Sequence, residues 1–154
     1  FDFGKFSWVN NVQYQKVTQE ENVDEILSGP LALNVPEWLI RSTLMLTSSI
    51  FNKALFFQSG ATFTFFTDYY ADQYNPLIAE FVTQNNTKIG EYPRVDFFFN
   101  AKIQSSRIYI KLENISAPIE HLIKVDTPYD YYAAPFTPYR DFAVRFGLIW
   151  NFFQ

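Results

Sequence analysis

Residues 95–113 read VDFFFNAKIQSSRIYIKLE, two stretches of alternating apolar and polar side chains joined by the polar residues 104–106. Alternation with a period of two is the pattern of a β-strand that has one apolar face. The segment therefore predicts two strands, at 95–103 and 107–113, with a short turn between them. The apolar faces of these strands carry Phe97, Phe99 and Ala101, and Ile108, Ile110 and Leu112.

Four further stretches, at 6–14, 38–48, 55–69 and 141–153, alternate in the same way and bring the number to six. Each has one apolar face, as a half-buried or lipid-facing strand requires. We therefore expect an all-β chain. The four additional apolar faces carry Phe6, Trp8, Val12 and Tyr14; Ile40, Leu44 and Leu46; Phe57, Ala61, Phe63 and Phe65; and Phe142, Val144, Phe146, Leu148, Trp150 and Phe152.

Charged residues are confined to the polar faces of these six stretches once each apolar face has been chosen. A charge that faces lipid at the middle of a bilayer costs roughly 2–4 kcal/mol, so this exclusion fits the wall of a membrane barrel. A soluble, aromatic-rich β-sandwich also alternates, and the pattern alone leaves both folds open. The charged residues are Arg41, Asp68, Asp96, Lys102, Arg107, Lys111, Glu113, Asp141 and Arg145.

The lengths of the connections favour the membrane barrel. The connections at 49–53 and 104–106 are short, whereas those at 15–37, 70–94 and 114–140 are long, and the two kinds alternate along the chain. Outer-membrane barrels have tight periplasmic turns at one rim and long extracellular loops at the other. The sequence therefore predicts an antiparallel transmembrane β-barrel segment.

The three tryptophans agree with this orientation. If the last strand ends on the periplasmic side, Trp8 and Trp150 lie near the periplasmic interface and Trp38 lies near the extracellular one. Aromatic girdles of outer-membrane barrels occupy these two depths. The membrane partner of the apolar face is then the lipid of a bacterial outer membrane.

Composition restricts the other classes of function. Of the 154 residues, 48% are hydrophobic and 20% are aromatic, and the net charge is -4. An acidic chain lacks the basic field that draws in nucleic acid, so we expect no nucleic-acid partner. There is no cysteine, which excludes disulfides and thiolate metal sites. No stretch approaches the roughly 18 uninterrupted apolar residues of a transmembrane helix.

Six strands are too few for a closed barrel, because outer-membrane barrels begin at about eight. An open sheet edge in lipid leaves backbone groups without partners, at several kcal/mol each. We therefore expect residues 1–154 to form a single barrel segment, the C-terminal portion of a longer chain, with pairing to another membrane subunit as the alternative. The first and last strands are expected to pair with strands outside the six.

The end of the chain resembles the C-terminal assembly signal of outer-membrane barrels. In residues 145–153, RFGLIWNFF, the polar position, the glycine and the two aromatic positions of that signal are filled by Arg145, Gly147, Trp150 and Phe152. The chain departs from the usual form by ending in Gln154 instead of an aromatic residue. The resemblance implies that the barrel-assembly machinery binds this strand by edge pairing.

A longer region resembles the putative-porin family of Gram-negative outer membranes, with the C-terminal strands of TonB-dependent receptors as a similar alternative. The resemblance rests on residues 52–60, 90–98, 100–103, 107–114 and 131–136. It implies an outer-membrane barrel that allows diffusion or uptake of small solutes. The alternative function is a barrel subunit of a secretion, uptake or adhesion assembly that acts mainly through protein contacts.

No motif predicts an enzyme, a cofactor or a metal site. His121, the single histidine, lies in a long connection without a nucleophile or carboxylate motif beside it. The acidic residues at 20–25 lack the glycine and spacing of an EF-hand. We interpret 126–132 as a proline-stiffened extracellular loop, with ligand recognition as the less favoured hypothesis, and 78–82 as a short helix.

The inward-facing charges are the remaining candidates for function. Lys102, Arg107, Lys111 and Arg145 are positioned to line a lumen and favour anions, or to pair with carboxylates across strands and fill the interior without selecting any solute. The sequence leaves both possibilities open and favours pairing. The candidate lumen-lining residues are Arg41, Asp68, Asp96, Lys102, Arg107, Lys111, Glu113 and Arg145.

Overall fold

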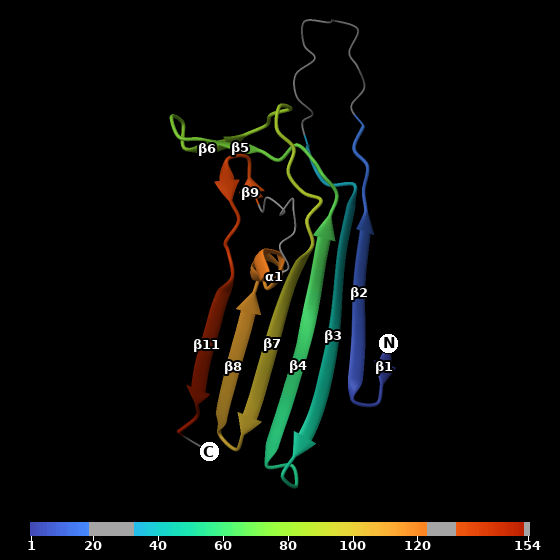
Figure 1. The fold of residues 1–154 in the computed structure, drawn as a ribbon, viewed down its shortest axis with the longest axis vertical. Helices are drawn as coiled ribbons and strands as arrows, with labels where there is room; N and C mark the ends of the chain where they lie inside the picture. Colours follow the sequence, from blue (N-terminus) through green and yellow to red (C-terminus); the bar gives the residue numbers. More distant parts are fainter. Residues whose placement is uncertain (19–32, 123–131, 153–154) are drawn as a thin grey trace, which may run out of the picture.

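The computed structural model describes residues 1–18, 33–122 and 132–152. Its main feature is one seven-stranded antiparallel sheet in the order β1-β2-β3-β4-β7-β8-β11 (Figure 1). Strands that are neighbours in this sheet also follow one another along the chain, if the short elements within the long connections are not counted. The strands are β1 (Asp2–Phe3), β2 (Phe6–Tyr14), β3 (Trp38–Ile50), β4 (Leu55–Phe66), β7 (Arg94–Ile103), β8 (Ser106–Glu113) and β11 (Ala143–Trp150).

The connections are sorted by length between the two ends of the sheet. The turns at 4–5, 51–54 and 104–105 all lie at one end, at the bottom of Figure 1, and we call this end the short-turn rim. The described parts of the connections at 15–37, 67–93 and 114–142 lie at the other end, the long-loop rim. The alternation predicted from the sequence is confirmed, as is the all-β, antiparallel fold of a barrel segment.

The hydrogen-bond register tests the choice of faces independently, because it does not depend on which side chains are apolar. It aligns Ala61 with Leu44 on one side and Phe97 on the other, and Phe99 with Ile110, which in turn aligns with Phe146. Every apolar face chosen from sequence therefore falls on the same side of the sheet. We call this side the apolar face and the opposite side the polar face.

The three tryptophans all lie on the apolar face. Trp38 opens β3 at the long-loop rim and Trp150 ends β11 at the short-turn rim, whereas Trp8, the third residue of β2, is aligned with Leu44 in the middle of β3. The Trp8 indole donates to Ser42 Oγ at 2.8 Å, and the ring of Trp38 lies 4.8 Å from that of Tyr14. The polar atom of the Trp8 indole thus finds a partner on a face that is mostly apolar.

The sheet is a single layer, and its buried residues gather at the long-loop rim. Among the described residues, the buried apolar side chains Ala71, Ile89, Tyr92 and Ala134 belong to that rim, and Ala101 lies within a long strand. The apolar face of the sheet stays open, with Phe146 82% exposed. A sheet whose large apolar side chains remain uncovered requires an apolar surrounding other than its own core.

The long connections contain structure that the sequence did not predict. Strands β5 (Gln73–Asn75) and β6 (Glu80–Val82) form one hairpin, and β9 (Tyr132–Ala134) and β10 (Thr137–Pro138) form another. A helix α1 (Ser116–Leu122) follows β8. The helix expected at 78–82 is wrong, because Phe81 and its neighbours pair with Tyr74 in the β5–β6 hairpin instead.

Strand ends differ from the predicted ones by a few residues. β4 stops at Phe66, and the chain continues to a single bridge between Tyr69 and Ile89, so the stretch to residue 69 is not one strand. β11 begins at Ala143 and ends at Trp150, although Asn151 N still donates to Ser105 O at 3.2 Å. Residue 153 of the predicted last strand lies outside the described residues.

The sheet does not close on itself. β2 and β11 are not paired with each other: β11 is one edge, and the short β1 covers only the beginning of β2 at the other. Phe1 extends that cover, since its carbonyl accepts from Trp8 N at 2.8 Å. From Val9 to Tyr14, β2 has no strand partner on its outer edge among the described residues.

Candidate functional site

The polar face carries all the charge of the six long strands. It holds six cations and two anions, a net charge of +4 on a chain whose overall net charge is -4. The cationic character of this face is therefore local and opposite to that of the whole protein. The residues are Arg41, Arg94, Lys102, Arg107, Lys111 and Arg145, with Asp96 and Glu113.

Toward the long-loop rim the charges neutralise one another around Glu113. Its carboxylate lies 2.9 Å from Lys111 Nζ and 2.9 Å from Arg145 Nε, with Arg140 Nη1 at 3.7 Å. Lys111 also lies 3.7 Å from Asp96. Because Lys111 and Arg145 are directly opposite in register, the shared carboxylate separates two like charges that would otherwise repel.

The same cluster attaches the last long connection to the sheet. Asp96 Oδ1 accepts from Asn114 N at 2.9 Å, and the fully buried Asn114 side chain donates to Arg140 O at 3.2 Å. Ser116 Oγ donates to Asn114 Oδ1 at 3.0 Å at the start of α1. Buried polar atoms with partners on both sides hold a loop in one position.

Aromatic residues of the long-loop rim pack against the upper end of the polar face. The ring of Phe66, on that face of β4, lies 5.2 Å edge-on from Tyr92, and the Arg94 guanidinium lies 4.8 Å from the Tyr139 ring. Tyr92 is 3% exposed and its hydroxyl donates to Tyr132 O at 2.6 Å. Burial raises the pKa of Tyr92 to about 12. Tyr92 and Tyr139 therefore cover the polar face at its long-loop end.

Toward the short-turn rim the arrangement of charges is different. Lys102 and Arg107 lie directly opposite each other on β7 and β8, and neither has a carboxylate partner among the described residues. They border a groove of about 400 Å³ in the polar face. The groove is also lined by Phe56, Gln58, Asn100, Tyr109 and Ile149.

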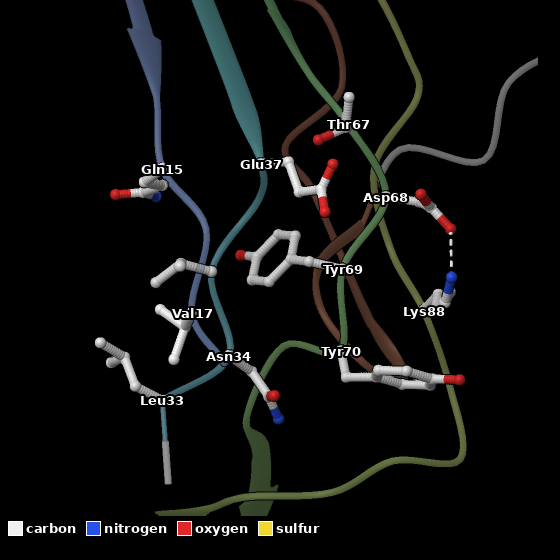
Figure 2. Close-up of a pocket in the computed structure, with 11 residues that line it drawn as sticks. Gln15, Val17, Leu33, Asn34, Glu37, Thr67, Asp68, Tyr69, Tyr70 and Lys88 are labelled. Atoms are coloured by element: carbon white, nitrogen blue, oxygen red, sulfur yellow. Dashed lines mark hydrogen bonds and ion pairs between the residues drawn. The ribbon is translucent and has the colours of Figure 1, made fainter. Parts of the chain in front are cut away.

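A second pocket, of about 380 Å³, lies outside the wall at the long-loop rim (Figure 2). Tyr69 points into it, and on one side Asp68 pairs with Lys88 at 2.8 Å. That hydrogen bond raises the pKa of Lys88, and burial raises the pKa of Tyr69. Asp68 thus belongs to the rim in the structure, beyond the end of β4, and not to the row of charges along the strands.

The four residues of the C-terminal signal take separate places on β11 and just after it. Arg145 pairs with Glu113 on the polar face, and the ring of Tyr109 lies across Gly147. Trp150 and Phe152 stack at 5.1 Å on the apolar side. Gly147 therefore has a packing role, because a Cβ there would meet the Tyr109 ring closer than van der Waals contact.

Sequence reasoning missed two members of the polar-face arrangement. Arg94 was assigned to the connection before a strand and Arg140 to a loop, so the alternation within the strands gave no signal for them. His121 lies in α1. The acidic segment at 20–25 and most of the loop at 126–132 lie outside the described residues.

None of the helices in the described residues is long and apolar enough to cross a membrane. In the same part of the chain, no three His, Cys, Asp or Glu side chains come together as a metal site would require.

Comparison with known proteins gives one match. The model of a protein family described as putative porin matches residues 1–154. No match was found among curated proteins or among solved structures. The similarity to the barrel ends of TonB-dependent receptors finds no support in these comparisons.

Proposed function

The chain belongs to the putative porin family, and from this premise we propose that its sheet is part of the wall of an outer-membrane β-barrel through which small solutes cross. Membership of the family implies a porin-like function in a bacterial outer membrane and a channel rather than an enzyme. The proposal adds that the apolar face contacts lipid and that the polar face lines the lumen.

The observation that carries the proposal is the separation of side chains between the two faces. The register puts no charged residue on the apolar face of the six long strands and eight on the polar face. Since burying apolar surface is worth roughly 25 cal/mol per Å², large exposed rings such as Phe146 and Phe63 favour a lipid surrounding over water. A wall with lipid on one side and water on the other accounts for both faces at once.

The packing of side chains at the long-loop rim favours a lumen that is narrower at that end. The ring of Tyr92 packs edge-on against Phe66, and Tyr139 lies against the Arg94 guanidinium. At the start of α1, Ser116 Oγ accepts a hydrogen bond from the backbone of β7. Loops that pack on the inner side of a wall reduce the cross-section there and set which solutes pass. We place the selective part of the proposed path between this rim and the Lys102–Arg107 row.

Closure of the proposed barrel needs additional strands. The outer edge of β2 from Val9 to Tyr14 and that of β11 each present backbone groups that lipid cannot satisfy, at several kcal/mol each. We propose that strands of the same barrel or of another membrane subunit pair with both edges. The barrel-assembly machinery is the proposed partner of β11, through Gly147, Trp150 and Phe152, during insertion.

Conductance tests the proposed function. The full-length natural protein, purified as a folded, heat-modifiable species, is added to a planar lipid bilayer in potassium chloride, with the boiled protein as control. Stepwise increases in current with the folded sample are expected. Folded protein that inserts, as shown by protease protection, but carries no current and does not swell solute-loaded liposomes would contradict the proposal and favour a barrel that acts through protein contacts.

A further inference from the structure

We propose that the groove beside Lys102 and Arg107 is a binding site for small organic carboxylates on their way through the pore. The inference rests on the proposed function, because it requires the polar face to line a water-filled path. It adds the chemical class of solute and the residues that recognise it.

The first observation is an in-register row across four strands. The row runs Phe56, Lys102, Arg107 and Ile149, so two cations stand side by side with an apolar residue at each end. Side chains directly opposite on neighbouring strands have Cβ atoms about 4.5–5.5 Å apart, and like charges at this distance are destabilising. Such a pair weakens the sheet on its own and is relieved when an anion lies between the two side chains.

The second observation is the contrast with the other pair of opposed cations. Lys111 and Arg145 also face each other across strands, but Glu113 lies 2.9 Å from both. Within the described strands, the Lys102–Arg107 pair has no such carboxylate. A solute carboxylate bound between Lys102 and Arg107 would neutralise them as Glu113 neutralises Lys111 and Arg145.

The third observation is the lining of the groove. The next row toward the long-loop rim holds Gln58, Asn100 and Tyr109 side by side, which supplies two amides and a phenol for further hydrogen bonds. Phe56 and Ile149 border the cations and present hydrocarbon surface. A volume of about 400 Å³ falls in the range of small-molecule sites. Charge, hydrogen-bond donors and apolar borders together fit an organic acid with a short hydrocarbon body better than a bare inorganic ion.

Ion selectivity and block by benzoate test the site in the full-length protein in planar bilayers. Reversal potentials under a potassium chloride gradient give the chloride-to-potassium permeability ratio, and benzoate added at fixed chloride measures binding by the fall in current. The K102Q/R107Q variant removes both charges. K53Q removes one charge from the nearby 51–54 turn, off the wall, and K102R/R107K keeps both charges in place.

The wild-type pore is expected to prefer chloride and to be blocked by benzoate. A surface potential of about one kT per unit charge raises the local anion concentration and lowers the local cation concentration about threefold each. Removing it in K102Q/R107Q should therefore lower the chloride-to-potassium permeability ratio roughly sevenfold and abolish the benzoate block. K53Q should behave like the wild type, and K102R/R107K should keep the preference for chloride because both charges remain. A conducting K102Q/R107Q pore with unchanged selectivity and block would overturn the carboxylate site alone, whereas a folded wild type without conductance would overturn the proposed function.

Discussion

Two glycines of the polar face each lie beneath an aromatic ring of the neighbouring strand. The ring of Phe98 lies over Gly60, and that of Tyr109 lies over Gly147. At Gly60 a Cβ would also meet the backbone carbonyl of Leu44 at 2.5 Å, whereas at Gly147 the atoms nearest to it all belong to the Tyr109 side chain. Rings laid across strand glycines restore the packing that the missing side chain leaves open.

This difference predicts a rescue at one glycine only. Gly147→Ala should destabilise the folded barrel by about 1–3 kcal/mol, because the ring must move from a close-packed position. In a Tyr109→Ser background the same change should cost almost nothing. The measurement is the denaturant midpoint of the full-length barrel in detergent micelles. Gly60→Ala in a Phe98→Leu background is the matched control and should stay destabilising, since the Leu44 carbonyl remains.

Tyr92 predicts a pH-dependent loosening of the long-loop rim. Its pKa in the folded rim, about 12, lies above the ordinary 10.0, so the protonated phenol adds stability that is complete below pH 10 and lost as the pH rises toward 12. Tyr92→Phe removes the hydrogen bond to Tyr132 O and should cost about 1 kcal/mol at neutral pH. Amide hydrogen exchange of Tyr132–Ala134 should therefore be faster in the Tyr92→Phe variant than in the wild type at neutral pH. The extra loss of protection that the wild type should show between pH 10 and 12 should be absent from the variant. Equal protection in both proteins would contradict this role.

At the scale of the elements, the long strands were predictable and the loop structure was not. β2 has the predicted bounds, and the bounds of β3, β7 and β8 differ from the predicted ones by one or two residues. These strands were predictable because apolar and polar residues alternate along each stretch. The hairpins β5–β6 and β9–β10 and the helix α1 depend on contacts with distant residues, such as Tyr92 with Tyr132 and Ser116 with Asn114. Such contacts between distant residues cannot be predicted from the local sequence pattern.

The two faces predict opposite responses to the same added charge. Ile110→Lys places an ammonium on the apolar face and should destabilise the barrel in a bilayer by roughly 2–4 kcal/mol if it lies near the midplane. Asn100→Lys puts the same group on the polar face of the adjacent strand and should change stability by less than about 1 kcal/mol. Reversible folding into lipid vesicles measures both. Equal costs would contradict the assignment of the faces.

At the scale of the whole molecule, the sequence predicted which charges share a face but not how they divide along it. The sequence favoured pairing over a lumen that selects anions. In the structure Glu113 pairs with Lys111 and Arg145, whereas Lys102 and Arg107 have no carboxylate partner among the described residues. Which cations are neutralised depends on the register that places Glu113 beside Lys111 and Arg145. The lengths of the turns and the anchoring of the loops set that register. The periodicity within one strand does not show how the strand is aligned with its neighbour.

The most direct test of the account is the environment of the two faces in a membrane. Spin labels are placed one at a time at Phe99, Ile110 and Phe146 on the apolar face, and at Asn100 and Tyr109 on the polar face, in the full-length protein in lipid vesicles. Since the apolar face is assigned to lipid and the polar face to water, oxygen should relax the first three labels and a water-soluble nickel complex the other two. Labels on the apolar face that are shielded from oxygen, or reached by the nickel complex as readily as the other two, would contradict this assignment.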